Sequence, residues 1–496
     1  MLARTAHEAA RRFGDRLVLD SPHGALTYSE LASAAQALAS GLAGRVGPGD
    51  LVALVLPSGP EWLVAAVAAD HLGAAVAGVS TVLGAVERAA QVELLSPDLV
   101  LAAPDTADGL PLRTPVAVLA PGGRGGELAS DAPPPPVAPH DPDRLAVICC
   151  TSGTTGRPKA ARFLVRHLEA VRDIDLGEAR DRWDGGAHML ASTQFAHVGM
   201  SLKLPWYLQT GSTLHVMGRW RADDALRLVS RHRMPTIGVV APQLALMLRS
   251  PLLDELDLSH VRAIIAGGAP SPPALVAEAR QRFGAAYSIR YSSTESGGVG
   301  LGTAFDAPDD EALHTIGRPR PGVEVRVVDE RDRPVPDDEV GELQLRSPAV
   351  MDGYHRDRDA TAAALTPDGW LRTGDLARVR PDGAVVLAGR RTDMYIRGGY
   401  NVFPEEVEAV LGEHPDLDAV AIVPQPDPVM GEVGVAVVVP SDPGKVPSLE
   451  SLRGFAADRL ARHKLPERLV VVDELPLTAA QKLDRRAVRE RVAAEG

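Results

Sequence analysis

The stretch TSGTTGRPKAAR, from Thr151 to Arg162, combines glycines, threonines and a lysine directly after an apolar run. Glycines let backbone N–H groups face an anion, threonine hydroxyls add donors, and Lys159 adds positive charge. This composition indicates a loop that binds phosphate, although a plain turn has a similar composition. It is not a Walker A loop, because Gly153 and Gly156 are too close together and Ala160 follows Lys159.

Short apolar segments alternate with helical patterns on both sides of this loop, which is typical of βαβ units around a largely parallel sheet. A proline-rich connection at 132–144 is expected to be a surface loop within one domain, because the alternation continues beyond it. The expected strands are 51–57, 75–80, 98–103, 145–150, 213–218, 236–242 and 261–268, and the expected helices are 60–73, 84–97, 222–233 and 271–284.

The pattern changes twice in the second half of the chain. Residues 323–330 and 341–347 predict an antiparallel hairpin. From about residue 391, two helical segments (405–414 and 449–463) are interleaved with strand-like ones. We therefore predict an α/β fold with a large N-terminal domain, residues 1–390, built of βαβ layers plus a small β-rich unit. A small mobile α+β C-terminal domain, residues 391–496, is expected to follow.

Composition excludes several classes of protein. The chain of 496 residues has a formal charge of −13, from 52 basic and 65 acidic side chains, which argues against broad nucleic-acid binding. Its apolar runs are too short for a membrane span, and its first residues predict an amphipathic helix. The adjacent Cys149 and Cys150 lie in an apolar run, so we expect buried thiols and a cytoplasmic location.

Five further segments follow the loop in order, and together they are more specific than any one of them. With the loop, this ordered set resembles the acyl-adenylate-forming superfamily, which includes acyl-CoA synthetases, adenylation domains of peptide synthetases and beetle luciferases. The resemblance covers nearly the whole chain. The segments are AGGAP (266–270), YSSTE (291–295), TGD (373–375), GRRTDMYIRGGYNVFPEEVE (389–408) and PLTAAQKLDRR (476–486).

The resemblance implies a reaction in two steps that uses ATP, Mg²⁺ and CoA. A carboxylate attacks the α-phosphate of ATP, pyrophosphate leaves, and a thiol then attacks the acyl-adenylate. Because two anions meet in the first step, positive charge and magnesium must neutralise the phosphates. A nucleotide-binding sensor without turnover is the alternative that is not an enzyme.

By the same resemblance, Thr294 contacts the α-phosphate and Glu295 binds Mg²⁺ through hard carboxylate oxygens. Taken singly, a carboxylate such as Glu295 could cap a helix and Asp375 could belong to a turn. The residues implied in ATP or AMP binding are Thr151, Ser152, Gly153, Thr154, Thr155, Gly156 and Lys159 at the β- and γ-phosphates, Ser292 in the segment that contacts the α-phosphate, Gly267, Gly268, Ala269 and Tyr291 around the adenine, and Asp375 with Arg390 near the ribose.

The resemblance also assigns roles in the C-terminal part of the chain. Lys482 is expected to contact the carboxylate and the α-phosphate during adenylation. The small domain is expected to rotate about a hinge at Thr392 between the two steps. Arg397, Gly398 and Gly399 then bind CoA, with glycines leaving room for the narrow pantetheine arm.

The acid is expected to be hydrophobic and not an amino acid. Residues 190–212 contain no acidic side chain that could pair with an ammonium group. Phe195-Ala-His197-Val-Gly199 is similar to the FxHxxG segment of acyl-CoA synthetases, which places His197 at the carboxylate end of the pocket unless it is structural. Free CoA is the expected thiol and a separate carrier protein the alternative; the oligomeric state stays open.

Three positions depart from the pattern of the superfamily, and all three replace glycine. They are Ala160, Ser292 and Gln481, which lie in segments that handle the phosphates of ATP. One interpretation is neutral drift in tolerant loops. The other is that adenylation is weak, so that the enzyme uses a preformed acyl-adenylate.

Overall fold

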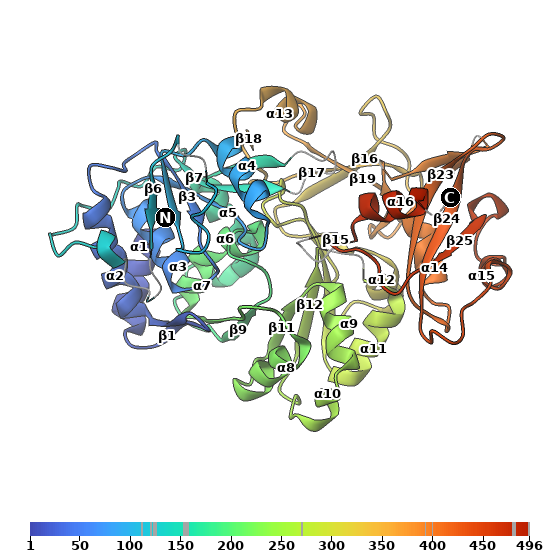
Figure 1. Cartoon of the computed structure of the whole chain (residues 1–496), viewed down its shortest axis with the longest axis horizontal. Coiled ribbons are helices and arrows are strands. Elements are labelled where there is room, and N and C mark those ends of the chain that lie inside the picture. Colours follow the sequence, from blue (N-terminus) through green and yellow to red (C-terminus); the bar gives the residue numbers. More distant parts are fainter. Residues whose placement is uncertain are drawn as a thin grey trace.

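The computed structural model describes residues 1–110, 113–119, 122, 126–151, 158–268, 271–391, 393–398, 400–478 and 483–494. Its architecture is mixed α/β, as predicted, with a large N-terminal and a small C-terminal domain (Figure 1). Within those residues, no helix has the length and apolarity needed to cross a membrane.

A seven-stranded sheet forms the first layer of the fold. Its interior strands are parallel, and two antiparallel strands close one edge. Helix α3 (Pro60–His71) is buried along its whole length, which explains its continuous apolar sequence. The strand order is β18 (Gly353–Tyr354), β8 (Lys159–Leu164), β7 (Leu145–Thr151), β4 (Ala75–Gly78), β3 (Leu51–Val55), β5 (Leu99–Ala102) and β6 (Val116–Val118).

The proline-rich connection joins β6 to β7, which belong to the same sheet, and most of its residues are exposed. The prediction of a surface loop within one domain is therefore confirmed. The two cysteines are free thiols on β7. Cys149 packs into one apolar cluster and Cys150 against another, as neighbouring residues of a strand do, and burial raises the pKa of each thiol to about 12.

The later βαβ segments form a separate sheet. Its parallel core joins β11 (Thr236–Val239), β12 (Ala263–Gly267) and β13 (Ala286–Tyr291). A four-stranded sheet adds β9 (His188–Ala191) and β10 (Thr213–Val216) to the first hairpin of the chain. The helices of these two layers include α8 (Ala222–Arg231), α9 (Ala241–Arg249) and α11 (Pro273–Phe283), whereas α1 (Leu2–Phe13) packs against α3.

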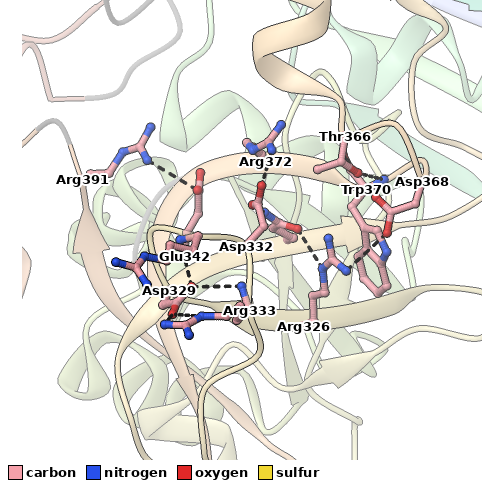
Figure 2. Close-up of polar contacts among 12 residues, drawn as sticks. Arg326, Asp329, Asp332, Arg333, Glu342, Thr366, Asp368, Trp370, Arg372 and Arg391 are labelled. Carbon is pink, nitrogen blue, oxygen red and sulfur yellow. Dashed lines mark hydrogen bonds and ion pairs between the residues drawn. The ribbon is translucent and has the colours of Figure 1, made fainter.

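The predicted hairpin is present, as β16 (Glu324–Val328) and β17 (Gly341–Arg346). It extends into a sheet with β19 (Leu371–Val379) and β20 (Val385–Arg390). Charged side chains cover one face of this unit, where Arg326 donates to Gln344 at 2.8 Å and lies 4.4 Å from the ring centroid of Trp370 (Figure 2). The unit lies between the seven-stranded sheet and the C-terminal part of the chain (Figure 1).

The C-terminal residues form their own sheet. The expected helix 449–463 is shorter in the structure, because the chain turns after Ala456 so that Leu460 and Leu465 enter the apolar core beside Leu452. Arg249 at the end of α9 pairs with Asp418 at 3.2 Å, which links the two domains. The elements are β21 (Tyr395–Arg397), β22 (Tyr400–Val402), β23 (Leu417–Asp427), β24 (Gly431–Pro440), β25 (Arg468–Val471), α14 (Pro404–Leu411), α15 (Leu449–Ala456) and α16 (Arg485–Ala494).

Helix α5 (Val165–Leu176) carries a pH-sensitive cap. The backbone N–H of Leu164 donates to Nδ1 of His167 at 3.1 Å. Burial, followed by the nearby Arg166, lowers the pKa of His167 to about 4. An exposed imidazole has a pKa of about 6.5, so the unfolded chain takes up this proton first as the pH falls. The stabilising contribution is therefore present above about pH 6.5 and is lost toward about pH 4.

We expect His167→Gln to flatten the pH dependence of the melting temperature between pH 7 and 5. Glutamine keeps an acceptor for the Leu164 N–H but cannot be protonated. Thermal melts of both proteins across this range measure the difference. An equally steep decline in His167→Gln would contradict the assignment.

Candidate active site

The candidate phosphate loop joins two paired strands. Thr151 at the end of β7 lies opposite Lys159 at the start of β8. The hairpin therefore holds both ends of the loop in fixed register, at the carboxyl end of the parallel strand β7. The loop residues Ser152, Gly153, Thr154, Thr155 and Gly156 lie outside the described residues.

Lys159 and Glu295 are brought together by a tyrosine that the sequence analysis missed. The ammonium of Lys159 lies 4.9 Å from the ring centroid of Tyr354, and the Tyr354 hydroxyl donates to Oε1 of Glu295 at 2.8 Å. Burial and the Glu295 carboxylate both raise the pKa of Tyr354, so its hydroxyl stays a donor. The pair Gly353-Tyr354 carries no distinctive motif, and its role follows from the pairing of β18 with β8.

A second group of contacts joins the predicted adenine and ribose positions. The hydroxyl of Tyr291 donates to Oδ2 of Asp375, and Nε of Arg390 lies 2.9 Å from Oδ1 of the same carboxylate. Burial and Asp375 raise the pKa of Tyr291 well above its ordinary value. Asp375 and Arg390 face each other across β19 and β20. The sequence analysis named all three residues, and the structure places them in one cluster.

The two groups are connected through the turn that follows β13. Tyr291 ends that strand, and Ser292, Thr294 and Glu295 follow it. The side chains therefore form two groups, and the backbone of residues 291–295 joins them. One group is Lys159, Tyr354 and Glu295, and the other is Tyr291, Asp375 and Arg390.

The glycines of AGGAP lie beside this turn. Gly267 ends β12 opposite Arg290 of the parallel strand β13, and a Cβ on Gly267 would lie 2.8 Å from the Arg290 carbonyl oxygen. Gly268 has a φ of +76°, which favours glycine. Ala269 lies outside the described residues. Both segments therefore end at the carboxyl edge of one parallel sheet, where α/β proteins bind ligands.

Glu342 supports the irregular part of β19 that presents Asp375, where the register with β17 shifts. Its Oε1 accepts the Gly374 N–H at 3.3 Å, and its Oε2 lies 3.5 Å from Nη1 of Arg391 (Figure 2). From the sequence, Glu342 was expected in the hairpin without a role. Its burial beside the Thr373–Asp375 segment is visible only in the folded chain.

The segment with His197 forms a tight turn against β4. The Phe195 N–H donates to Oγ of Ser58 at 2.9 Å, and its ring meets Trp62 edge-on at 5.4 Å. His197 precedes the short helix α6 (Val198–Ser201). Gly298, near Glu295, lies close to Val198, so this turn borders the turn that follows β13.

Gly78→Ala is expected to displace the His197 turn. A Cβ on Gly78 would lie 2.5 Å from Cα of Ala196, and a backbone atom cannot yield as a flexible side chain can. We expect a loss of about 1–3 kcal/mol in unfolding free energy and a raised KM for the acid. Gly47→Ala is the matched control, because its added methyl group meets no heavy atom within 4 Å. Equal KM values in both variants would contradict the expectation.

The predicted CoA-binding residues lie on the C-terminal sheet. Nε of Arg397 donates to Oε1 of Glu467 at 2.6 Å, and the Gly398 N–H donates to the Met430 carbonyl at 2.8 Å. Gly398 has a φ of +56°, and a Cβ there would lie 2.6 Å from Cε of Met430. The hinge residue Thr392, Gly399, Gln481 and Lys482 lie outside the described residues.

The donor groups around Glu295 suit magnesium. Mg²⁺ prefers hard oxygen ligands and is usually held by one or two carboxylates together with substrate phosphates. Glu295 supplies such a carboxylate, oriented by the Tyr354 hydroxyl. The adjacent Thr294 adds a hydroxyl in the same turn.

Two family models match the chain. Residues 6–355 match the AMP-binding enzymes, and residues 406–482 match the C-terminal domain of AMP-binding enzymes. This chain belongs to the AMP-binding enzyme family. Several proteins similar to it are CoA ligases. The chain is an AMP-forming acid–thiol ligase.

Several relatives and solved structures match nearly the whole chain. An indoleacetate–CoA ligase from Aromatoleum aromaticum is 34% identical over 496 residues, 95% of this chain and 94% of that protein. The amide bond synthetase McbA from Marinactinospora thermotolerans has a TM-score of 0.87 and 30% identity, covering 99% of this chain and 100% of that one. ATP-bound MatB from Rhodopseudomonas palustris has a TM-score of 0.88 at 26% identity, covering 99% of both chains.

Proposed function

We propose that this AMP-binding enzyme is an acyl-CoA ligase that converts a hydrophobic carboxylic acid, through its acyl-adenylate, to a CoA thioester. The observation that carries the proposal is the pair of side-chain groups held by the turn after β13. The first group offers the Lys159 cation and the Glu295 carboxylate, which suit phosphates and magnesium. The second group offers the Asp375 carboxylate, which suits ribose hydroxyls.

The proposed roles follow from the chemistry of each group. The loop from Thr151 to Lys159 binds the β- and γ-phosphates, and Thr294 contacts the α-phosphate. Glu295 would hold Mg²⁺, which would neutralise the charge of the leaving group. Tyr291 stacks on adenine while its hydroxyl bond to Asp375 fixes the ring. Asp375 accepts the ribose hydroxyls.

The structure supports a hydrophobic acid in two ways. Segment 190–212 contains no Asp or Glu, so it offers no carboxylate to pair with the ammonium of an amino acid. Gly199 and Gly238 border open space, since a Cβ on either would meet no heavy atom within 4 Å. His197 is proposed to face the carboxylate of the acid, as its turn adjoins the adenylate-binding turn.

We further propose that the domain boundary lies near residue 390 and that the C-terminal domain turns about Thr392. Lys482 would act in adenylation, and Arg397, Gly398 and Gly399 in the thioester step. The free cysteines support a reducing, cytoplasmic location.

The geometry favours a retained adenylation step over use of a preformed acyl-adenylate. Ala160 lies in β8 with 2% of its surface exposed, and its side chain packs into an apolar cluster. Neither Ala160 nor Ser292 has a positive φ, so neither position requires glycine. Two of the three departures are therefore accommodated without strain.

The test assays both half-reactions with a panel of hydrophobic acids. Pyrophosphate exchange with acid and ATP reports adenylation, and mass spectrometry of thioesters formed with CoA reports transfer. We expect both to proceed at comparable rates. Thioester formation from synthetic acyl-adenylate without exchange would instead identify a transfer-only enzyme.

Further acceptors separate the remaining alternatives. A holo-carrier protein replaces CoA in one arm of the experiment, and a simple amine replaces it in another, because an amide bond synthetase shares the fold. Acylation of the carrier or the amine alone would overturn the CoA assignment. Nucleotide binding without any acyl transfer would identify a sensor.

A further inference from the structure

Three histidines converge at a place distant in sequence from the adenylate-binding residues. His188 begins β9, His215 lies in the adjacent parallel strand β10, and His232 directly follows helix α8. One ring nitrogen from each lies within 4.8 Å of the others. Strand β9 and helix α8 approach each other at the lower edge of the molecule in Figure 1.

The rings are close enough to share one ion. Nδ1 of His188 lies 2.8 Å from Nε2 of His215, and the ring of His232 is centred 4.0 Å from that of His215 and 4.8 Å from that of His188. Tetrahedral zinc places its imidazole nitrogens about 2.0–2.1 Å from the metal, so small side-chain rotations suffice to bring all three into contact.

His215 also has a feature typical of a metal ligand. Only 1% of its surface is exposed, and its Nδ1 is buried without a well-aligned hydrogen bond, although Oδ2 of Asp20 lies 3.3 Å away. Asp20 lies opposite His215 on the neighbouring strand β1 (Leu17–Ser21). Histidines that bind metals commonly present their second ring N–H to a carboxylate in this way.

Metals bind the neutral form of an imidazole, so the charged groups that face the three rings bear on the site. Arg16 is the nearby cation, and its guanidinium donates to the Gly186 carbonyl at 2.8 Å while Asp20 offsets its charge.

We propose that His188, His215 and His232 form a binding site for a divalent transition metal, with Zn²⁺ the ion that best suits three imidazoles. Nε2 of His215 and Nδ1 of His188 bind the ion, and Asp20 orients His215 by accepting its Nδ1–H. The ion would join β9 and β10 to the end of α8. Its role is structural and is independent of the proposed acyl transfer.

The experiment titrates Zn²⁺ into the full chain, prepared without a polyhistidine tag and stripped with a chelator. Isothermal titration calorimetry is expected to show one ion per chain, and the melting temperature should rise with Zn²⁺. His232→Gln removes one of the two half-buried ligands and should weaken binding by at least about 100-fold. Asp20→Asn should weaken it by about 10- to 100-fold.

His140→Gln is the matched control, since His140 pairs on the surface with Glu169 at 3.5 Å. It should bind Zn²⁺ as the unmodified chain does. Failure of the chain to bind a stoichiometric ion, or unchanged affinity in His232→Gln and Asp20→Asn, would overturn the proposal. If His232→Gln does not fold, the Zn²⁺ affinities of Asp20→Asn and of the unmodified chain are compared instead.

Discussion

Arg485→Gln is expected to destabilise the C-terminal domain by about 3 kcal/mol. Arg485 starts α16 and has 16% of its side chain exposed. Its guanidinium donates to Glu408 at 2.6 Å and lies within 3.4 Å of Glu405 and Asp393. Removing this cation leaves Glu405 and Glu408 as poorly solvated carboxylates that repel one another, while Asp393 keeps only Arg489 at 3.5 Å.

Urea denaturation and hydrogen exchange of α14 measure this loss, with Arg486→Gln as the control. Arg486 is the next residue, is 79% exposed and has only a distant pairing with Glu490 at 3.8 Å. Indistinguishable unfolding of the two variants would contradict the expectation. Asp393 directly follows the proposed hinge residue Thr392, so we also expect slower adenylation in Arg485→Gln.

Glu295→Gln should slow pyrophosphate exchange by about 100- to 1,000-fold, the usual loss when one preorganised electrostatic contact is removed. Glutamine keeps the shape of the side chain and an acceptor for the Tyr354 hydroxyl, but it removes the charge proposed to hold Mg²⁺. Raising the Mg²⁺ concentration should restore part of the rate, which a purely structural defect would not allow.

Two further variants make this test specific. Tyr354→Phe keeps the ring beneath Lys159 and loses only the hydrogen bond to Glu295, so we expect a smaller loss, about tenfold. Glu339→Gln, at an exposed carboxylate of the β-rich unit, should exchange pyrophosphate normally. A normal exchange rate in Glu295→Gln would remove the basis for the assigned role.

Much of the fold could be predicted from the sequence because its elements are strongly periodic. The apolar run before Thr151 is β7, the helix at 60–73 is α3, and the hairpin near 323 is present. The partition of the strands among sheets could not be predicted, because it depends on contacts between distant segments. The end of α15 was also missed, since burial of Leu460 outweighs the local helical pattern.

Residues of the candidate site were predicted where they belong to a recognisable sequence motif. Residues whose role depends only on where the fold places them were missed. Tyr291, Asp375 and Arg390 belong to recognisable segments, and they meet in the structure. Tyr354, Glu342 and Gly78 have no local signature. Their importance comes from strand pairing and close approach, which a single sequence does not reveal.

The assembly of the site from separate sheets has a consequence for biosynthesis. Tyr354 lies 59 residues beyond the carboxylate that it orients, and Asp375 lies 84 residues beyond Tyr291. A ribosome must therefore release the chain as far as Arg390 before the large domain can offer all of its proposed contacts to a nucleotide. ATP can stabilise only a form that binds it, so it cannot guide the earlier folding of the emerging polypeptide. The first layers have to hold together by their own strand pairing and apolar burial until the last strands of the large domain arrive.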